Sequence, residues 1–433
     1  MKIISTYGIK IKHYNKIFNH TVEIYRKAVD FFIGVALNEW DTISIIPGSK
    51  LRVNKIEALT IRTKNNTDPE YPFEDYNKAF YKFPSYLRRS AISEALGKVS
   101  SYKSNLANWE FDPKGKKPSK PRAGNLYPCL YKDNMYQRNS DYEAKIKVRI
   151  RNTWDWLTVS LKKSDVDYII KHCHSLKECA PSLQKKGREW FLNFPFEEKV
   201  SLNTVPIKKQ IIAAVDLGVN SACVVSVMKP DGTVIGRKFL KLPRENDCLI
   251  HSMNRIKKAQ QNGATRTPRL WAKTKGISED IAVKTANFIV KTAHDYNVNT
   301  IIFEHLDFRN KSKAQRLQHW KANRVQSIVT HKAHRLGIRV SRVNAYNTSK
   351  LAFDGSGQVK RDAKNYSVCT FTTGKIYNCD LNASYNIGAR YFIREILKSS
   401  SVKKRLQLVA KVPRVSKRST CTLSTLISLN AVL

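Results

Sequence analysis

The stretch Ile211-Ile212-Ala213-Ala214-Val215-Asp216 decides the fold class of this chain, because five apolar residues run directly into an acid. Glu304 closes a similar run at 300–303, and Asp380 stands just before the amphipathic stretch 381–387. An acid that ends a buried strand lies at the rim of a sheet, where it can meet other acids. Three converging carboxylates can hold two divalent cations about 4 Å apart, the geometry for in-line phosphodiester cleavage.

The charge of the chain indicates a polyanionic partner. Its 433 residues include 77 Lys and Arg against 35 Asp and Glu, a formal net charge of +42. The basic residues run along the whole chain, and nucleic acid is the commonest partner for such a surface. A ribosomal-type or histone-type binder without catalysis is the alternative, but such proteins rarely carry long apolar strands that end in acids. The length predicts two to four domains.

The cysteines and the hydropathy pattern bear on where the protein works. Eight Cys occur without framework spacing, mostly in apolar runs, which favours reduced thiols in a cytosolic protein. The N-terminus lacks a signal-peptide core, and no apolar run approaches about 18 residues. We therefore expect a soluble, cytoplasmic protein with no membrane partner.

The first half of the chain predicts a β domain that is interrupted by helices. Alternation over 3–11 indicates a strand, and three- and four-residue periodicity indicates helices over 15–40 and 85–109, the latter with Ser85 as its N-cap. The Pro-interrupted segment 112–122 is a basic linker. After it, strands are predicted at 145–151, 157–161 and 189–194.

Candidate nucleic-acid contacts come from three basic regions. They are the linker, the stretch after residue 255, and the strand 145–151, which alternates aliphatic residues with a cationic row expected in solvent. For the strand, an ordinary solvated sheet face is an equally good interpretation. The candidate residues are Lys116, Lys117, Lys120, Arg122, Lys145, Lys147, Arg149, Arg151, Arg266, Arg269 and Lys273.

The second half of the chain predicts an α/β domain. Strands at 211–215, 222–228 and 234–240 follow one another, the last two joined by the hairpin turn Asp231-Gly232. This order predicts three antiparallel strands, with Asp216 leaving the first.

Two further helices precede strands in this half. Ser278 is the expected N-cap of the first helix, because Glu279 and Asp280 follow in its first turn, and this helix leads to the strand that ends at Glu304. A helix over 321–336 then precedes a strand over 339–343.

The acids occur in the order Asp, Glu, Asp, with gaps of 88 and 76 residues between 216, 304 and 380. The motifs are Val-Asp-Leu-Gly-Val-Asn at 215–220, Ile-Phe-Glu-His-Leu at 302–306 and Asp-Leu-Asn-Ala-Ser-Tyr-Asn-Ile at 380–387. In this order the chain resembles the RuvC-type RNA-guided nucleases, namely transposon-encoded TnpB proteins and the miniature type V CRISPR effectors. The resemblance spans about 208–393; before that it rests on the order of elements alone.

The resemblance implies a multidomain α+β fold. A wedge-like β-barrel would be interrupted by a helical recognition insertion and followed by an RNase H-like α/β RuvC domain, with a target-nucleic-acid-binding module inserted as a degenerate zinc ribbon. The implied bounds are 1–12 and 113–205 for the barrel, 13–112 for the helices, 206–345 and 380–433 for the RuvC domain with its C-terminal tail, and 346–379 for the module.

The resemblance also implies RNA-guided cleavage of DNA next to a short adjacent motif. Asp216, Glu304 and Asp380 would hold two Mg²⁺, one to activate water and one to stabilise the leaving 3′ oxygen. The implied partners are a guide RNA and double-stranded target DNA, and we expect a monomer in a prokaryotic cytoplasm, used at the nucleoid.

Three alternatives stand beside this interpretation. A cleavage-deficient RNA-guided DNA-binding repressor is one, although such relatives generally lose a triad acid. A DDE transposase is disfavoured, because its last acid is Glu and lies close behind the second Asp. Individually, Asp216 could begin a Gly turn and Asp380 could N-cap the last helix.

The chain departs from the family at the zinc ribbon. One thiolate cannot hold a structural zinc, so we predict a module without zinc whose fold depends on aromatic residues. Cys369 is the one thiolate left; Leu351, Asp354 and Thr372 stand at the other three ligand positions, and the aromatic residues are Phe353, Tyr366, Phe371 and Tyr377.

Two more departures concern the last acid and the tail. Cys379 stands where many TnpB relatives have Arg directly before the last Asp, and Arg361 is a candidate to replace that cation. Basic residues over 403–418 could contact the guide RNA. The apolar segment 421–429 is expected to dock on the body, because as an exposed strand it would invite aggregation.

Overall fold

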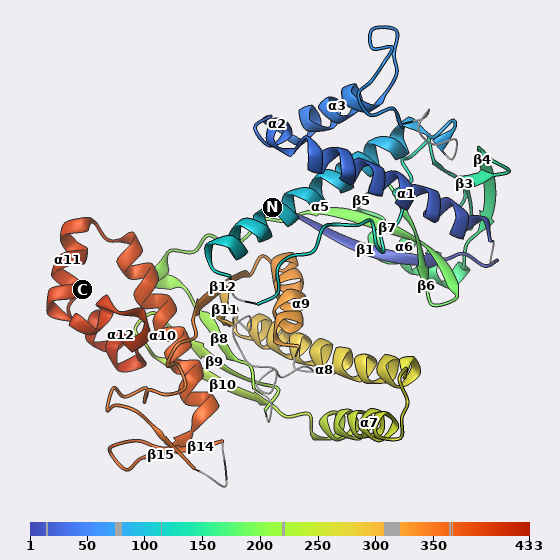
Figure 1. Cartoon of the computed structure of the whole chain (residues 1–433). Helices are drawn as coiled ribbons and strands as arrows, with labels where there is room; N and C mark the ends of the chain where they lie inside the picture. The colour runs from blue at the N-terminus through green and yellow to red at the C-terminus, as the bar shows by residue number, and fades with distance from the viewer. Residues whose placement is uncertain are drawn as a thin grey trace. The chain divides into compact units, whose positions relative to one another are not determined.

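A computed structural model describes residues 1–13, 16–73, 80–113, 115–218, 221–306, 321–362, 365 and 367–433. The chain divides into two compact units (Figure 1). The N-terminal unit is Lys2–Glu198, and the C-terminal unit is Lys199–Leu433 together with Met1. Both mix helices and strands. None of the helices in these described ranges is long and apolar enough to cross a bilayer.

The N-terminal unit places one strand before its helices and the remaining strands after them. Its elements are β1 (Lys2–Lys10), α1 (Ile17–Asn38), α2 (Trp40–Ser44), α3 (Ser49–Thr60), α5 (Ser85–Phe111), β2 (Tyr136–Ser140), β3 (Glu143–Ile150), β4 (Thr153–Ser160), α6 (Lys163–Cys173), β5 (Lys177–Glu178), β6 (Ser182–Lys186) and β7 (Glu189–Lys199). The predicted insertion of helices after the first strand is therefore confirmed. Helix α5 begins at Ser85 with Pro84 as its N-cap, so the prediction of Ser85 as the cap is wrong by one residue.

The helices of this unit pack through a buried aromatic core. Helix α1 lies along α5, where the Tyr25 hydroxyl is 3.2 Å from Ser90 Oγ in the buried interface. Phe73 stacks between Phe32 and Phe80, with ring centres 4.8 and 4.4 Å away. This core accounts for the apolar periodicity of α1.

The strands of the N-terminal unit form two open sheets. One has the order β1-β7-β5 with β6 also paired to β7, and the other has the order β2-β3-β4. An isolated bridge between Ile11 and Leu161 is a link between β1 and the end of β4. Over the described residues these sheets do not close into a barrel, in contrast to the barrel that the resemblance implies.

Strand β3 corrects the expected cationic row. Ile146 and Val148 are buried as the alternation predicts, and Lys147 is half-buried, with its Nζ 5.9 Å from the ring centre of Trp156. Arg149, however, is only 3% exposed, so the prediction of a solvent-facing row is wrong at this residue. The reason is that α1 packs against β3, and the backbone N–H of Arg149 donates to Thr21 Oγ1 at 3.0 Å.

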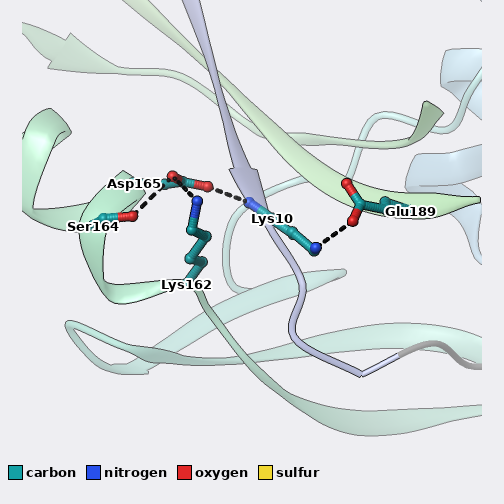
Figure 2. Close-up of polar contacts among 5 residues, drawn as sticks. All are labelled: Lys10, Lys162, Ser164, Asp165 and Glu189. Atoms are coloured by element: carbon teal, nitrogen blue, oxygen red, sulfur yellow. Dashed lines mark hydrogen bonds and ion pairs between the residues drawn. The ribbon is translucent and has the colours of Figure 1, made fainter. Parts of the chain in front are cut away.

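An acid in the first turn of α6 fastens this helix to β1 (Figure 2). Asp165 Oδ2 accepts the Lys10 N–H at 3.1 Å, and Lys162 Nζ lies 3.3 Å from Asp165 Oδ1. The Lys10 side chain turns away to pair with Glu189 on β7. Asp165 thus satisfies a strand-end amide that the sheet leaves unpaired.

The C-terminal unit is an α/β domain. Its elements are β8 (Ile212–Asp216), β9 (Cys223–Met228), β10 (Val234–Leu240), α7 (Pro243–Gln261), α8 (Pro268–Asp295), β11 (Thr300–His305), α9 (Ala322–Arg335), β12 (Arg339–Asn344), β13 (Lys360–Arg361), β14 (Val368–Thr370), β15 (Ile376–Asn378), α10 (Cys379–Ser399), α11 (Val402–Lys411) and α12 (Leu423–Asn430). The main sheet has the order β10-β9-β8-β11-β12. Strands β8, β9 and β10 are antiparallel, as predicted, while β11 runs parallel to both β8 and β12.

Helices cover both faces of this sheet. Ile212 and Ala214 of β8 belong to the core under α10, while Ala213 and Val215 belong to the core that includes α8 and α9. Successive side chains of a strand point to opposite faces, so burial on both sides requires an unbroken apolar run. Helix α10 comes very close at Gly388, where a Cβ would stand 3.3 Å from Ala214 Cβ.

One prediction for the C-terminal unit is wrong in detail, and another is confirmed. Helix α8 begins at Pro268, so Ser278 is a buried residue inside the helix and not its N-cap. The apolar tail forms helix α12, with Thr422 and Thr425 making a capping box. Its docking on the body is confirmed, because Leu426 and Leu429 are fully buried in the core around α10.

Substituting Asp165 should measure the link between α6 and β1. Asp165→Ala leaves the Lys10 N–H without its acceptor, and we expect the free energy of unfolding to fall by about 1–3 kcal/mol in urea denaturation. Asp165→Asn is the matched control, since it keeps an acceptor oxygen and loses only the ion pair with the exposed Lys162, worth about 0–1 kcal/mol. Equal losses for the two variants would contradict this role of the hydrogen bond.

Candidate functional site

The three acids of the sequence motifs lie at one end of the main sheet, where the central strands β8 and β11 end. Asp216 is the last residue of β8, and Glu304 lies near the end of β11. Because β11 runs parallel to β8, with Ile302 paired to Ala214, the two strands bring their acids to the same edge. Asp380 is in the first turn of α10, which covers one face of this sheet.

The acids are close enough to affect one another's ionisation. Burial raises the pKa of Asp216 well above its ordinary value, and the carboxylates of Glu304 and Asp380 raise this pKa further. Burial also raises the pKa of Glu304 and of Asp380. Half-buried like charges repel, so this edge of the sheet favours a positively charged ligand.

Neighbouring donors hold each carboxylate. The Thr348 hydroxyl donates to Glu304 Oε1 and lowers the pKa of Glu304, and the Ser221 hydroxyl acts in the same way on Asp380. The backbone N–H of Leu217 does so for Asp216. Neither Thr348 nor Ser221 was predicted as a site residue, because no local pattern marks either hydroxyl as the partner of an acid; Thr348 lies 44 residues after Glu304.

The cap of α10 decides between two interpretations of Asp380. Asn378 Oδ1 accepts the Leu381 N–H at 2.9 Å, so Asn378 is the N-cap and Asp380 does not have that structural role. Asp380 is left at the sheet edge with the other two acids.

The glycine after the first acid is required by close approach. A Cβ on Gly218 would stand 2.8 Å from the carbonyl oxygen of Ser221 and 3.7 Å from Asp380 Oδ2. Only a residue without a side chain lets this turn pass so near the last acid. The neighbouring motif residues Val219 and Asn220 lie outside the described residues.

One cation faces the acids from the inserted module. Arg361, on β13, lowers the pKa of both Asp216 and Asp380 by its positive charge. Cys379 is buried directly before Asp380, where relatives carry Arg. The expectation that Arg361 supplies the missing cation is thus consistent with its position.

A second cation, Arg390 of α10, lies deeper and was not singled out from the sequence. Its guanidinium lowers the pKa of Glu304 while being 4% exposed. It donates to four backbone carbonyls, those of Asn344 at 2.8 Å, Tyr346 at 2.7 Å, Ser419 at 3.0 Å and Cys421 at 3.1 Å. Arg390 therefore fastens the end of β12 and the C-terminal tail to the helix that carries Asp380.

The inserted module is built on aromatic packing. The Phe353 ring centre lies 5.5 Å from that of Phe371, 5.1 Å from Tyr377 and 5.2 Å from Tyr385. Lys375 Nζ is 4.9 Å from the Phe353 ring centre. Tyr366, also expected in this core, lies outside the described residues. The module is thus packed around rings at the place where the family ribbon has its ligands.

The residues at the three positions where the resemblance would place zinc ligands make local contacts instead. Thr372 Oγ1 donates to the Ser356 carbonyl at 2.7 Å, and Asp354 Oδ1 accepts the Ser356 N–H at 2.9 Å. Leu351 forms a bridge with Gln358. In the part of the chain that the structure describes, no three His, Cys or acidic side chains are grouped as ligands of one metal ion.

Buried amides of α10 join the module to the helix. Asn382 accepts the Phe353 N–H at 2.8 Å and donates to the Leu351 carbonyl at 2.9 Å. Asn386 donates to the carbonyls of Thr348 and Leu351, at 2.9 and 2.8 Å. These contacts explain the Asn-punctuated motif after Asp380, and they also position the loop that carries Thr348.

Most of the predicted nucleic-acid residues are exposed. In the N-terminal unit these include the linker residues Lys116, Lys117, Lys120 and Arg122; in the C-terminal unit they are Arg266, Arg269 and Lys273, near the start of α8. Lys117 Nζ lies 5.4 Å from the ring centre of Trp109. Lys145 and Lys147 are half-buried, and the burial of Arg149 removes it from a surface contact.

Two parts of the chain match known families. Residues 5–150 match the Aq_aa04 family, and residues 323–387 match the family described as Cas12f1-like, TNB domain. The second match covers α9, β12, the aromatic module and the first turns of α10, including Asp380.

The fold also has a counterpart among solved structures. The structure of the mini-RNA-guided endonuclease CRISPR-Cas_phi3 superposes with a TM-score of 0.51 at 10% identity, covering 89% of this chain and 92% of that one. At this identity the likeness concerns the fold alone.

Sequence comparison identifies relatives of this chain. The uncharacterized protein aq_aa04 of Aquifex aeolicus (strain VF5) is 29% identical over 174 residues, covering 34% of this chain and 97% of that protein. The TnpB-like protein aq_aa05 of the same organism is 26% identical over 234 residues, covering 47% of this chain and 74% of the relative. The chain is a relative of the TnpB family, as the motifs around its acids predicted.

The aromatic module yields a test of its independence from zinc. Phe371→Ala removes a buried ring, and we expect it to lower the free energy of unfolding by about 3–5 kcal/mol in urea denaturation.

The zinc chelator TPEN should leave the melting temperature of the unmodified protein unchanged, because one thiolate cannot hold a closed zinc site. A fall in melting temperature on chelation, reversed by added zinc, would contradict the prediction.

Proposed function

We propose that this chain is an RNA-guided DNA endonuclease that cuts target DNA beside a short adjacent motif. The observation that carries the proposal is the meeting of Asp216, Glu304 and Asp380 at one sheet edge, in the order and on the elements of a RuvC-type site. The kinship with TnpB-like proteins supports the same conclusion. The guide RNA and double-stranded target DNA are the proposed partners.

We assign the parts of the chain accordingly. The RNase H-like RuvC domain comprises 206–345 and 380–433, and the aromatic module 346–379 contacts the target nucleic acid. The helices within 13–112 serve as the recognition insertion. The strands of 1–12 and 113–205 take the wedge role, as two open sheets and not as a closed barrel.

The chemistry of the donor set fits Mg²⁺, although the three carboxylates, as the described residues place them, are not grouped as ligands of a single ion. The donor set consists of three carboxylates, the hard oxygen ligands that Mg²⁺ prefers, and their mutual repulsion at a half-buried edge is relieved by divalent cations. Asp216, Glu304 and Asp380 would hold the ions. When bound, the ions would polarise the scissile phosphodiester and neutralise the charge that develops on it.

The protein's own groups would then position the carboxylates and neutralise the charge of the phosphate. Thr348 and Ser221 orient the carboxylates of Glu304 and Asp380 through their hydroxyls. Arg361 adds a positive charge from the side of the module, where an approaching phosphate needs one. Exposed basic residues such as Lys116 and Arg266 attract the backbone of the guide and target without reading sequence.

Co-expression with the flanking genomic DNA, followed by sequencing of the bound RNA, tests the proposal. We expect a discrete RNA and Mg²⁺-dependent cleavage of a matched plasmid. Asp216→Ala should lower the rate at least about a thousand-fold while RNA binding is kept, because the metal site supplies several kcal/mol. Asp247→Ala, which removes an exposed carboxylate from α7 of the same unit, is the matched control.

The other outcomes are informative in different ways. Guided binding without cleavage by the unmodified protein would favour a cleavage-deficient repressor, in keeping with the buried Cys379 at the position of the family Arg. Absence of any discrete RNA would overturn RNA guidance and leave a generic nucleic-acid binder.

Arg361→Ala tests the replacement cation. Losing the charge that faces Asp216 and Asp380 should slow single-turnover cleavage about ten-fold or more. Lys360→Ala is the control, because Lys360 is the exposed neighbour on the same short strand. Equal rates for the two variants would remove Arg361 from the site.

A further inference from the structure

A basic cavity lies in the C-terminal unit, along the edge strand β12. It has a volume of about 620 Å³ and is enclosed by β12, α10, α11 and the tail between α11 and α12. Seven basic side chains line it against one acidic side chain, Glu395. Glu395 is already engaged by Arg394 at 2.8 Å, so the cavity has a large excess of positive charge.

Of the seven lining cations, Arg342 donates to Gln326 Oε1 at 2.8 Å and Lys398 is an exposed lysine, and the other five divide into two sets. Arg390 and Arg394 are fixed, the first by four carbonyls and the second by the Arg342 carbonyl and Ser341 Oγ, each at 2.8 Å. Arg339, Arg405 and Arg418 are exposed and make no hydrogen bond or ion pair within the described ranges. The fixed set holds the walls in place, while the second set is available to a ligand.

The three available guanidiniums come from three separate elements. Arg339 begins β12, Arg405 is on α11, and Arg418 begins the 3-10 turn Arg418–Thr420. A guanidinium fork matches phosphate oxygens, and cations spread over three elements suit several linked phosphates better than one small anion. Apolar side chains, among them Val340, Leu397 and Val415, share the lining and offer surface for sugar or base.

We propose that this cavity, which none of the three carboxylates lines, binds a phosphodiester segment of nucleic acid. The inference rests on the proposed function, because it assigns the C-terminal tail to the grip on the guide or target. It gives the basic tail a defined role, since Arg405 and Arg418 form one wall and β12 forms the other. The edge strand β12 thereby becomes a second contact region for the sugar-phosphate backbone of the nucleic acid.

The test compares two triple variants with the same loss of charge. Arg339→Gln/Arg405→Gln/Arg418→Gln removes the three available guanidiniums of the cavity and leaves Lys398 in place. Lys229→Gln/Lys238→Gln/Lys241→Gln removes three exposed cations at the opposite edge of the same sheet, from the turn before β10, from β10 itself and from the residue after it. All six side chains are exposed, so both variants should keep the melting temperature of the unmodified protein.

Affinity is measured by fluorescence anisotropy with labelled single-stranded RNA and with DNA of the same sequence, over a series of salt concentrations. The cavity variant should bind at least about ten-fold more weakly near 0.15 M salt, with the slope of log affinity against log salt reduced by about two. The control variant should lose less in both quantities. A loss confined to RNA assigns the cavity to the guide, and one confined to DNA assigns it to the target.

The failure of this inference is distinct from failure of the proposed function. Equal losses for the two triple variants, or unchanged affinity in the cavity variant, overturn the cavity as a binding site even where guided cleavage is observed. A selective loss of affinity in a protein that never cleaves supports the cavity and overturns the nuclease proposal instead.

Discussion

The architecture of the C-terminal unit depends on one constraint, the burial of β8 on both faces. Ile212 and Ala214 pack under α10, while Ala213 and Val215 pack towards α8 and α9. A strand buried on both faces can place a charged residue only where it emerges, and Asp216 occupies that position. The parallel pairing of β11 brings Glu304 to the same edge, and α10, which needs Gly388 to approach β8, brings Asp380. The cluster of carboxylates is therefore a consequence of the core.

The inserted module is held together by aromatic packing and by the helix that follows it. The resemblance implies a zinc ribbon here, but only one of the four ligand positions that it assigns, 369, holds a Cys. Here the rings of Phe353, Phe371 and Tyr377 fill the centre of the module. The amides of α10 hold its chain through Leu351 and Thr348. The module thereby remains fixed to the helix of Asp380, with Arg361 on the side of the acids.

Patterns confined to one element were predictable from the sequence, and contacts between distant elements were not. The apolar runs before Asp216 and Glu304 predicted both the strands and the acids, because the buried residues and the acid that leaves the core are consecutive in the sequence. The Ser-Glu-Asp signal at 278–280 failed, since α8 runs continuously past it from Pro268. Alternation could not reveal that α1 covers Arg149. Likewise, no local pattern marks Thr348 as the partner of Glu304.

Arg390 explains why the acids, the module and the tail behave as one assembly. A buried guanidinium is costly unless each of its donors finds an acceptor, and this one finds four carbonyls. One of these carbonyls, that of Asn344, ends β12, a second belongs to Tyr346 at the start of the module, and two lie in the tail that forms a wall of the basic cavity. Its charge also stabilises the ionised form of Glu304. Displacing the tail would leave donors of Arg390 unsatisfied beside Glu304, so the order of the tail and the electrostatics of the carboxylates are coupled through one side chain.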